Sequence, residues 1–199
     1  MKIVLIDDHP LVTASLADRL RSLGHDVSVH FTLQEARQSL QSEVTDLGIL
    51  DIDLGGDQGT DLLLDRALAD CLPATVVILS GTTDRDEIVM ALYSGAHAFV
   101  TKSIPFDDVV TAVLDAIHYT DADEPVMWVP AERRFKPASD IFPRGVVLSP
   151  RERDVFRLLR RGLTDKAIAS ELERSVHTIR VQIRSILRKR GKTRRSVHY

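Results

Sequence analysis

The first half of the chain alternates short apolar runs with helix-like segments, and this alternation is the strongest constraint on its fold. The runs are mostly aliphatic or β-branched. They cover residues 3–6, 47–50, 75–79 and 98–100, and Val27 and Val29 mark one further strand. Short strands separated by helices form parallel sheets, because a parallel pair needs a crossover connection. The pattern therefore predicts the α/β class, with a doubly wound, five-stranded parallel sheet.

Capping and termination signals predict five helices around these strands. Pro10 suits a first helical position, and Gly24 suits the residue after a helix end. Thr32 and Glu35 form a capping box at the start of the next helix. The other three helices are expected at 59–70, 84–93 and 105–118.

Reactive side chains follow the strands at the points where they end. Asp7 and Asp8 follow the first run, Asp51 follows the second, and Ser80 and Lys102 follow the last two. The carboxyl ends of parallel strands share one edge, so these side chains can meet there. Crowded carboxylates repel one another unless a hard cation such as Mg²⁺ compensates their charge. A carboxylate beside that cation can act as a nucleophile and form an aspartyl phosphate, so the set predicts phosphoryl chemistry.

The remaining metal-binding and redox-active residue types indicate no second site. His9 and His25 are interpreted as surface or turn histidines, because neither has a second ligand at metal spacing. Cys71 is the only cysteine, which fits a reducing compartment. The first apolar run is far shorter than a membrane span of about 20 residues. We therefore expect a soluble, cytoplasmic protein with no membrane partner.

Charge divides the chain into an acidic front and a basic rear, although the net charge is only −3. Residues 148–199 hold 15 Lys and Arg against 5 Asp and Glu, which leaves 11 basic and 24 acidic residues for 1–147. A basic domain favours nucleic acid as its partner. The two halves predict two domains, at 1–119 and 148–199.

Residues 120–147 interrupt both patterns and are predicted to form a linker. Four prolines occur in this segment, and proline stiffens and extends linkers. Trp128, the only tryptophan, also lies here. Two interpretations stay open: Trp128 is an incidental apolar residue, or it packs with Met127 against one domain.

The final segment carries signals for three helices. Ser149 and Glu152 form a capping box with Pro150 at the first helical position. Thr164 and Ser175 suit the caps of the second and third helices. The third helix, expected to end near residue 190, has an inward isoleucine face. Arginines recur on its other face at positions 180, 184 and 188. Two short helices, the second one basic, are typical of a helix-turn-helix.

The first domain resembles the response-regulator receiver domains of the CheY-like kind, which have a flavodoxin-like fold. The resemblance rests on IDDHP at 6–10, ILDIDL at 49–54, VVILSG at 76–81 and AFVTKS at 98–103. It implies that Asp51 is the phosphoacceptor and that Mg²⁺ is the cofactor. The other implied roles are metal binding for Asp7 and Asp8, a backbone-carbonyl metal ligand at Asp53, a switch hydroxyl at Ser80, a phosphate-pairing lysine at Lys102 and a switch aromatic at Phe99.

The rear domain resembles the LuxR-type output domain through LSPRERDVFRLLRRGLTDKAIASEL and HTIRVQIRSILRKRG. With the receiver in front, the whole chain is similar to NarL/FixJ-family response regulators. The resemblance implies sequence-specific binding to double-stranded DNA. It places Arg180, Val181 and Arg184 at base-contacting positions, and Thr178, Lys166 and Arg188 at phosphate contacts. Glu173 and Arg174 depart from the family, which has glycine and a buried aliphatic residue in this turn.

We therefore expect a transcription regulator, not an enzyme, whose DNA binding is controlled by a sensor histidine kinase. RNA polymerase is a further candidate partner. The short C-terminal segment predicts a monomeric rear domain. A homodimer should then form through the phosphorylated receiver, on the surface of its fourth and fifth helices and last strand.

Two alternatives from other functional classes remain open at this point. A haloacid-dehalogenase-like phosphatase would use Asp51 and Asp53 as a DxD motif, but it leaves Asp7 and Asp8 unexplained. A receiver-based protein adaptor would bind no specific DNA. Turnover of a phosphate monoester would favour the first alternative, and salt-resistant, sequence-selective DNA retention would exclude the second.

Overall fold

The computed structural model describes residues 1–199 except 64, 69, 123, 143–148, 161–162 and 190–199. The chain divides into two compact units, Met1–Ile141 and Phe142–Tyr199, and each is described by itself. Among the described residues, no helix is both long and apolar enough to cross a membrane.

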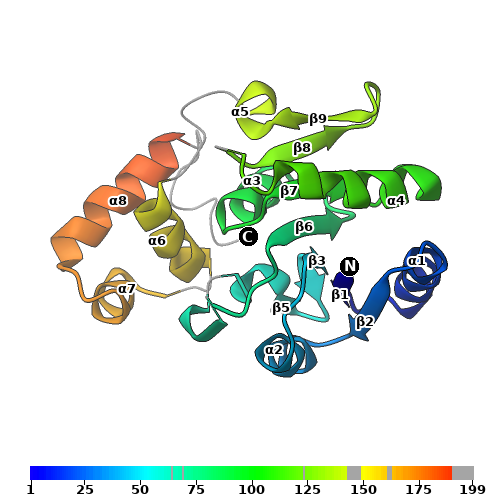
Figure 1. Ribbon diagram of the computed structural model, residues 1–199. Helices are drawn as coiled ribbons and strands as arrows, with labels where there is room; N and C mark the ends of the chain where they lie inside the picture. Colours follow the sequence, from blue (N-terminus) through cyan, green and yellow to red (C-terminus); the bar gives the residue numbers. More distant parts are fainter. Residues whose placement is uncertain (64, 69, 123, 143–148, 161–162, 190–199) are drawn as a thin grey trace. The chain divides into compact units, whose positions relative to one another are not determined.

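A seven-stranded sheet forms the centre of the first unit, in the order β2-β1-β3-β6-β7-β8-β9 (Figure 1). Its first five strands are parallel. They are β1 (Lys2–Ile6), β2 (Asp26–His30), β3 (Leu47–Leu50), β6 (Thr75–Ser80) and β7 (Ala98–Thr101). The predicted doubly wound parallel sheet is therefore confirmed, but the sheet has two strands more than predicted.

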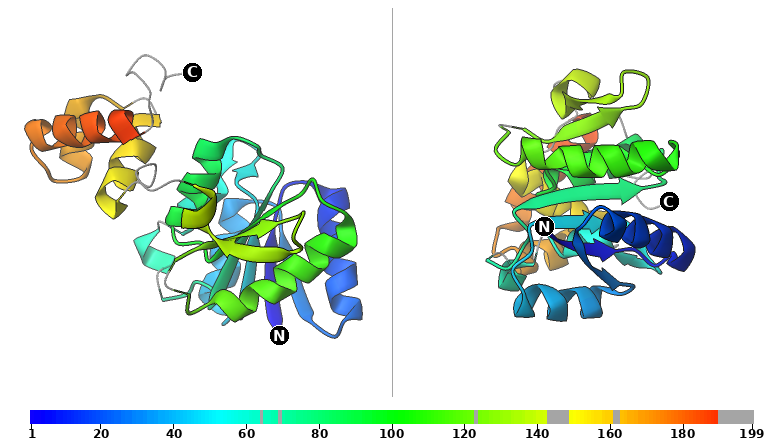
Figure 2. Two further views of the ribbon diagram at one scale, coloured as in Figure 1. Left: turned by 90° about the horizontal axis from the view of Figure 1, so that it is seen from above. Right: turned by 45° about the vertical axis from the view of Figure 1, so that its right-hand side comes forward.

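Four of the α-helices described in the first unit connect or follow these five strands. They are α1 (Pro10–Ser22), α2 (Leu33–Ser42), α3 (Arg85–Tyr93) and α4 (Phe106–Asp115), and the 3-10 turn η3 (Ala116–Tyr119) continues α4. Figure 2 shows α1 and α4 beside the strands of the sheet. Apolar side chains of these two helices share one core with alternate residues of β1, β3, β6 and β7. Helix α1 ends as predicted, because Gly24 adopts a φ of +87° that favours glycine.

The predicted helix at 59–70 is wrong. The short strands β4 (Asp53–Leu54) and β5 (Asp57–Gln58) form a hairpin first, and the 3-10 turns η1 (Gly59–Asp61) and η2 (Arg66–Leu68) follow. Gly55 and Gly56 both have positive φ, which suits a two-residue hairpin turn. Asp65 accepts a hydrogen bond from the backbone N–H of Ala67 at 3.0 Å. Such a local bond competes with continuous helix.

The predicted linker is also wrong in its described part, because residues 126–141 belong to the first unit. Strand β8 (Val126–Val129) pairs in parallel with β7, and β9 (Arg134–Pro137) returns antiparallel to it. The short helix α5 (Ala138–Ile141) follows, and the next unit begins at Phe142. The prediction rested on the prolines of this segment. Of these, Pro125 and Pro130 flank β8 and Pro137 ends β9, positions where proline removes few ladder hydrogen bonds.

The side chain of Trp128 packs the β8–β9 hairpin into the core of the first unit. Its side chain is 2% exposed and belongs to the core shared by α1 and α4. The indole meets the Phe135 ring edge-on, with 5.2 Å between ring centroids, and Phe135 meets Tyr119 at 5.0 Å. Arg133 adds an ion pair to Asp108 on α4 at 2.6 Å. Of the two open interpretations, packing of Trp128 against a domain is confirmed.

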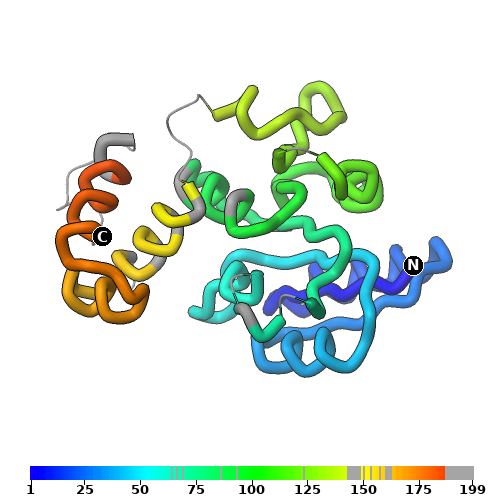
Figure 3. Tube along the Cα trace, turned by 60° about the vertical axis from the view of Figure 1, so that its left-hand side comes forward, coloured from blue at the N-terminus to red at the C-terminus, as the bar shows by residue number. Residues whose placement is uncertain are grey.

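The second unit contains three described helices, α6 (Pro150–Arg160), α7 (Asp165–Glu171) and α8 (Val176–Lys189) (Figure 3). The predicted capping box is present, since Ser149 N donates to Glu152 Oε2 at 2.8 Å and Glu152 N donates to Ser149 Oγ at 3.3 Å. Thr164 and Ser175 cap α7 and α8 as predicted. Residue 190, where the third helix was expected to end, lies outside the described residues.

The turn between α7 and α8 departs from ordinary side-chain preferences at Glu173. Its φ is +51°, in the left-handed region that favours glycine. Glu173 N donates to Ser170 O at 3.3 Å, and Arg174 N donates to Ala169 O at 2.9 Å. This bond pair is the Schellman motif, which usually has glycine at this position. Strain at Glu173 therefore accompanies the hydrogen bonds that close the turn.

Candidate functional site

Asp7, Asp51 and Lys102 meet at the carboxyl edge of the first unit's sheet, as their positions after β1, β3 and β7 predict. Lys102 Nζ lies 2.6 Å from Oδ2 of Asp51 and 2.7 Å from Oδ2 of Asp7. Asp51 is only 4% exposed and Asp7 only 2%. Buried carboxylates are costly unless they are paired. The ammonium group of Lys102 therefore supplies the partner of both buried carboxylates.

The pKa of Lys102 is raised above its ordinary value. Burial alone would lower this pKa, but hydrogen bonds and the charges of Asp51 and Asp7 together outweigh burial. The backbone N–H of Lys102 donates to the carbonyl of Ser80 at 2.9 Å, which ties the end of β7 to the end of β6. A positive charge is thus fixed beside Asp51.

The backbone around Asp51 leaves no space for a side chain at Gly59. The amide of Asp51 donates to Ile6 O at 2.9 Å, and Oδ1 of Asp51 accepts from the amide of Ile52 at 2.6 Å. Gly59 N donates to Ile52 O at 2.7 Å, and a Cβ on Gly59 would lie 1.9 Å from the carbonyl oxygen of Asp51. Sequence reasoning assigned Gly59 only to the start of a helix. No spacing rule signals such a close approach of two backbone segments.

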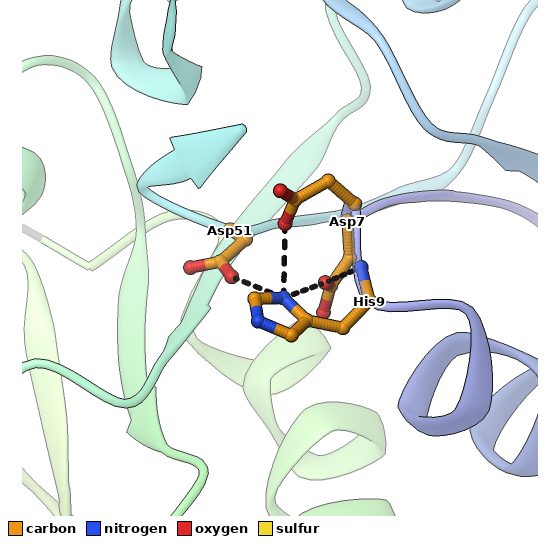
Figure 4. Close-up of side chains that lie close together, drawn as sticks. Asp7, His9 and Asp51 are labelled. Carbon is orange, nitrogen blue, oxygen red and sulfur yellow. Dashed lines mark hydrogen bonds and ion pairs between the residues drawn. The ribbon is translucent and has the colours of Figure 1, made fainter. Parts of the chain in front are cut away.

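His9 is exposed, as its interpretation as a surface or turn histidine expects, but its ring also lies beside the acidic cluster. Its Nδ1 lies 2.9 Å from Oδ1 of Asp8, 3.1 Å from Oδ1 of Asp7 and 3.9 Å from Oδ2 of Asp51. Figure 4 shows the ring between the carboxylates of Asp7 and Asp51. One ligand atom from each of these four residues lies within 4.8 Å of all the others. The tertiary structure supplies the partners that sequence spacing does not show.

The other expected receiver residues lie around this cluster. Ser80 is buried at the end of β6, and its Oγ accepts from the amide of Thr82 at 3.3 Å. Phe99 is fully buried in β7 and is paired in register with Met127 of β8. Asp53 is exposed, and its carboxylate accepts from the amide of Gly56 at 3.3 Å.

The cluster fits a hard divalent cation. Three carboxylates face one lysine, so negative charge remains after Lys102 is paired. Oxygen donors are the ligands that Mg²⁺ prefers. Asp7, Asp8 and Asp51 are the side chains placed to hold it.

In the second unit, α8 buries one face and exposes the other. Ile179, Ile183 and Ile186 are buried, while Val181 is 48% exposed, which is unusual for a valine. The exposed face also carries Thr178, Arg180 and Arg184, and Lys166 is exposed on α7. The backbone at position 188 is helical, but its side chain lies outside the described residues, so the predicted contact of Arg188 stays a prediction.

Arg180 is exposed, but it is paired with an acid. Its Nε donates to Oδ2 of the buried Asp165 at 3.1 Å. By contrast, Arg184 Nε donates to the Arg180 carbonyl at 3.3 Å within α8, and no ion pair to Arg184 is formed by the residues that the structure describes. Thr178 and Ser175 share a hydroxyl hydrogen bond of 2.8 Å. Arg184 therefore has the weaker internal restraint of the two arginines.

Two family matches correspond to the two units. Residues 3–114 match the response regulator receiver domain, and residues 146–197 match the luxR family of bacterial regulatory proteins. The nitrate/nitrite response regulator protein NarL of Escherichia coli K12 is 30% identical over 197 residues, covering 94% of this chain and 88% of NarL. The chain belongs to the NarL/FixJ family of response regulators.

Other relatives agree with this membership of the NarL/FixJ family. The transcriptional regulatory protein FixJ of Bradyrhizobium diazoefficiens is 33% identical over 189 residues, covering 94% of this chain and 87% of FixJ. A structure of RcsB from Salmonella enterica serovar Typhimurium, bound to promoter rprA in the presence of a phosphomimetic, has a TM-score of 0.64. It is 22% identical and covers 97% of this chain and 93% of RcsB, a likeness that shows the fold.

As a NarL/FixJ-family member, this chain is a response regulator with a receiver and a LuxR-type DNA-binding domain, and it regulates transcription. The receiver accounts for the acidic edge, and the LuxR-type domain accounts for the basic helices. Neither the phosphatase nor the adaptor interpretation is favoured.

Proposed function

We propose that Asp51 accepts a phosphoryl group from a sensor histidine kinase and that this modification controls DNA binding by the second unit. The carrying observation is the ion pair of 2.6 Å between Lys102 Nζ and Asp51 Oδ2 at a buried strand end. A carboxylate oxygen of Asp51 attacks phosphorus, and the bond from phosphorus to the donor breaks with its electron pair leaving on the donor. The fixed ammonium group then balances charge on the phosphoryl oxygens.

We propose Mg²⁺ as the cation of this reaction, held by Asp7, Asp8 and Asp51 together with the backbone carbonyl of Asp53. When bound, the cation neutralises charge on the phosphoryl group. Ser80 would donate its hydroxyl to one phosphoryl oxygen in place of its present role as an acceptor. Phe99 would respond through β7, the strand that carries the aromatic ring and that Lys102 directly follows.

Phosphorylation with a small acyl-phosphate donor and Mg²⁺ tests this assignment by intact mass. Asp51→Asn should abolish incorporation, because an amide is a poor nucleophile at phosphorus. Asp53→Asn is the matched control, since it changes a nearby exposed acid while keeping the backbone carbonyl. Undiminished incorporation in Asp51→Asn would refute the assignment. Catalytic turnover of generic phosphate monoesters by the unchanged protein would contradict the proposal that the chain is not an enzyme.

We propose that α8 enters the major groove of DNA, with Arg184, Val181 and Arg180 toward base edges. Arginine can bond guanine through two hydrogen bonds, and a valine methyl can contact thymine. Lys166 and Thr178 would contact phosphates and position the helix. Because Arg180 is paired with Asp165, its base contact requires that pair to open or to share the guanidinium group.

Replacement of Arg184 and Lys166 separates these roles. Arg184→Ala should cost about 1–3 kcal/mol on the specific site and relax preference at one base position. Lys166→Ala should weaken specific and random DNA alike and reduce the salt dependence of binding. Equal losses on specific and random DNA for Arg184→Ala would place this residue on the DNA backbone.

RNA polymerase is the further partner that we propose, and the cytoplasm is the compartment where these partners meet.

We propose a phosphorylation-dependent homodimer through the receiver, but not through the surface expected from sequence. That surface includes the outer edge of β7, which here pairs with β8. An alternative lies between α1 and α4, where Leu11 and Phe106 are exposed beside a cavity of about 320 Å³. Leu11→Asp should weaken the phosphorylated dimer in sedimentation. Val44→Asp, at an exposed apolar residue elsewhere on the surface, is its control. Equal effects of the two substitutions would refute the α1–α4 surface.

A further inference from the structure

The imidazole of His9 lies in the receiver site, but the proposed reaction gives it no role. The proposed phosphorylation needs an aspartate, a lysine, a hydroxyl and a cation, but no histidine. Yet Nδ1 of His9 lies 2.9 Å from Oδ1 of Asp8. The ring is also directed at Asp7 and Asp51 (Figure 4).

The separations around Nδ1 match the spacing of ligands around one small cation. In an octahedron with bonds of about 2.0–2.1 Å, adjacent ligand atoms are about 2.8–3.0 Å apart and opposite ones about 4.0–4.2 Å apart. Nδ1 of His9 lies 2.9 and 3.1 Å from oxygens of Asp8 and Asp7, near the adjacent spacing. Its distance to Oδ2 of Asp51 is 3.9 Å, near the opposite spacing. All three distances are therefore compatible with ligands around one cation.

The backbone fixes His9 in this orientation. His9 precedes α1, its amide donates to Oδ1 of Asp7 at 2.9 Å, and Pro10 begins the helix. Its carbonyl accepts from both the amide and the hydroxyl of Thr13, at 3.1 and 2.7 Å. Thr13 is itself buried. The backbone that carries the ring is therefore held at three points.

An oxygen of Asp8 gives a second, independent indication of a shared ligand. Asp8 Oδ1 is shielded from solvent, and no hydrogen bond to it is formed by the described residues, although Nδ1 of His9 is close. A shielded carboxylate oxygen without a donor is costly. A cation between this oxygen and Nδ1 would satisfy both atoms.

We propose that His9 supplies a nitrogen ligand, through Nδ1, to the cation of the receiver site. This inference rests on the proposed phosphoryl-accepting function, because it concerns the same cation. Oxygen ligands suit Mg²⁺ and Mn²⁺, whereas imidazole suits later transition metals. His9 therefore makes the site bind Co²⁺ or Ni²⁺ more strongly, relative to Mg²⁺, than its carboxylates alone would.

Electron spin-echo spectroscopy of Mn²⁺ bound to the tag-free full chain tests the ligand directly. The unchanged protein should show nitrogen modulation from a coordinated imidazole. The modulation should change when histidine is labelled with nitrogen-15, which separates imidazole from backbone nitrogen. His9→Ala should keep Mn²⁺ bound and lose the modulation, and His25→Ala, at the opposite end of α1, should keep it. Since the His9 side chain is 62% exposed, its removal should leave the fold intact.

Competition titrations measure selectivity with the same variants. His9→Ala should weaken Co²⁺ binding by about tenfold or more, since even outer-shell partners of metals are worth about 10–100-fold. The same variant should change Mg²⁺ binding much less. Bound Mn²⁺ without nitrogen modulation, or equal losses for Co²⁺ and Mg²⁺, would overturn the role of His9 alone. A failure of Mn²⁺ to bind, or binding that Asp8→Asn leaves unchanged, would instead overturn the cation site of the proposed function.

Discussion

Replacing Trp128 tests whether the β8–β9 hairpin is a structural part of the receiver. Trp128→Ala removes an indole that is 2% exposed and faces Phe135 at 5.2 Å. Loss of a buried large aromatic side chain costs about 3–5 kcal/mol through lost burial and the cavity left behind. Domains are stable by only about 5–15 kcal/mol in total, so the first unit should lose a large part of its stability.

The unpaired indole nitrogen gives this prediction a graded series. Trp128 Nε1 is buried and has no hydrogen-bond partner among the described residues. Such an atom costs about 1–3 kcal/mol. Trp128→Phe removes the N–H but keeps a ring against Phe135, so it should cost clearly less than Trp128→Ala. Val129→Ala, on the half-buried side of the same strand, should cost about 1 kcal/mol or less.

Urea unfolding of the full chain, followed by far-ultraviolet circular dichroism, measures these differences. Hydrogen exchange at the amides of β7 and β8 assigns the loss to the first unit. A cost for Trp128→Ala no larger than that for Val129→Ala would refute the reasoning. The hairpin would then be a loosely attached segment, in agreement with the linker predicted at 120–147, and β7 would be the last stable strand of the sheet.

Three further predictions concern a half-buried histidine, a strained turn and a close backbone approach. Burial lowers the pKa of His97, whose Nδ1 accepts a hydrogen bond from a backbone N–H of β6 at 3.0 Å. The free energy of unfolding should therefore be highest above the ordinary histidine pKa and should fall as the pH drops through the lowered pKa of His97. His97→Asn keeps a hydrogen-bond acceptor but does not titrate, so acid unfolding curves of this variant should depend less on pH. Glu173→Gly removes left-handed strain of about 1–2 kcal/mol and adds about 0.5–1 kcal/mol of backbone entropy cost. Hydrogen exchange should therefore show α7 and α8 stabilised by about 0.5–1 kcal/mol. No increase in amide protection, or a decrease, would contradict the strain at Glu173. Gly59→Ala should abolish phosphorylation or unfold the first unit, because its Cβ would lie 1.9 Å from the carbonyl of the phosphoacceptor, whereas Gly81→Ala, in open space, should do neither.

Local periodicity and capping chemistry determined most of the elements that the sequence predicted well. The apolar runs alone were enough to predict the five parallel strands, and the capping box predicted at Ser149 and Glu152 is present. Lys102 and Asp51 were expected to meet, because strand order alone brings the carboxyl ends of parallel strands together. Each of these inferences uses interactions among near neighbours or a general rule of sheet topology.

Tertiary structure decided the features that depend on distant partners. The sequence by itself determined an acidic phosphoryl-type edge and a basic helical unit, because residue type and strand-end position are local properties. Only the tertiary structure shows that Trp128 packs against Phe135 and that this proline-containing segment forms two paired strands. The same holds for His9, whose ring faces Asp51 because β1 and β3 are neighbours in the sheet. Burial and coordination are set by which side chains surround a residue, and those neighbours come from segments that lie far apart in the sequence.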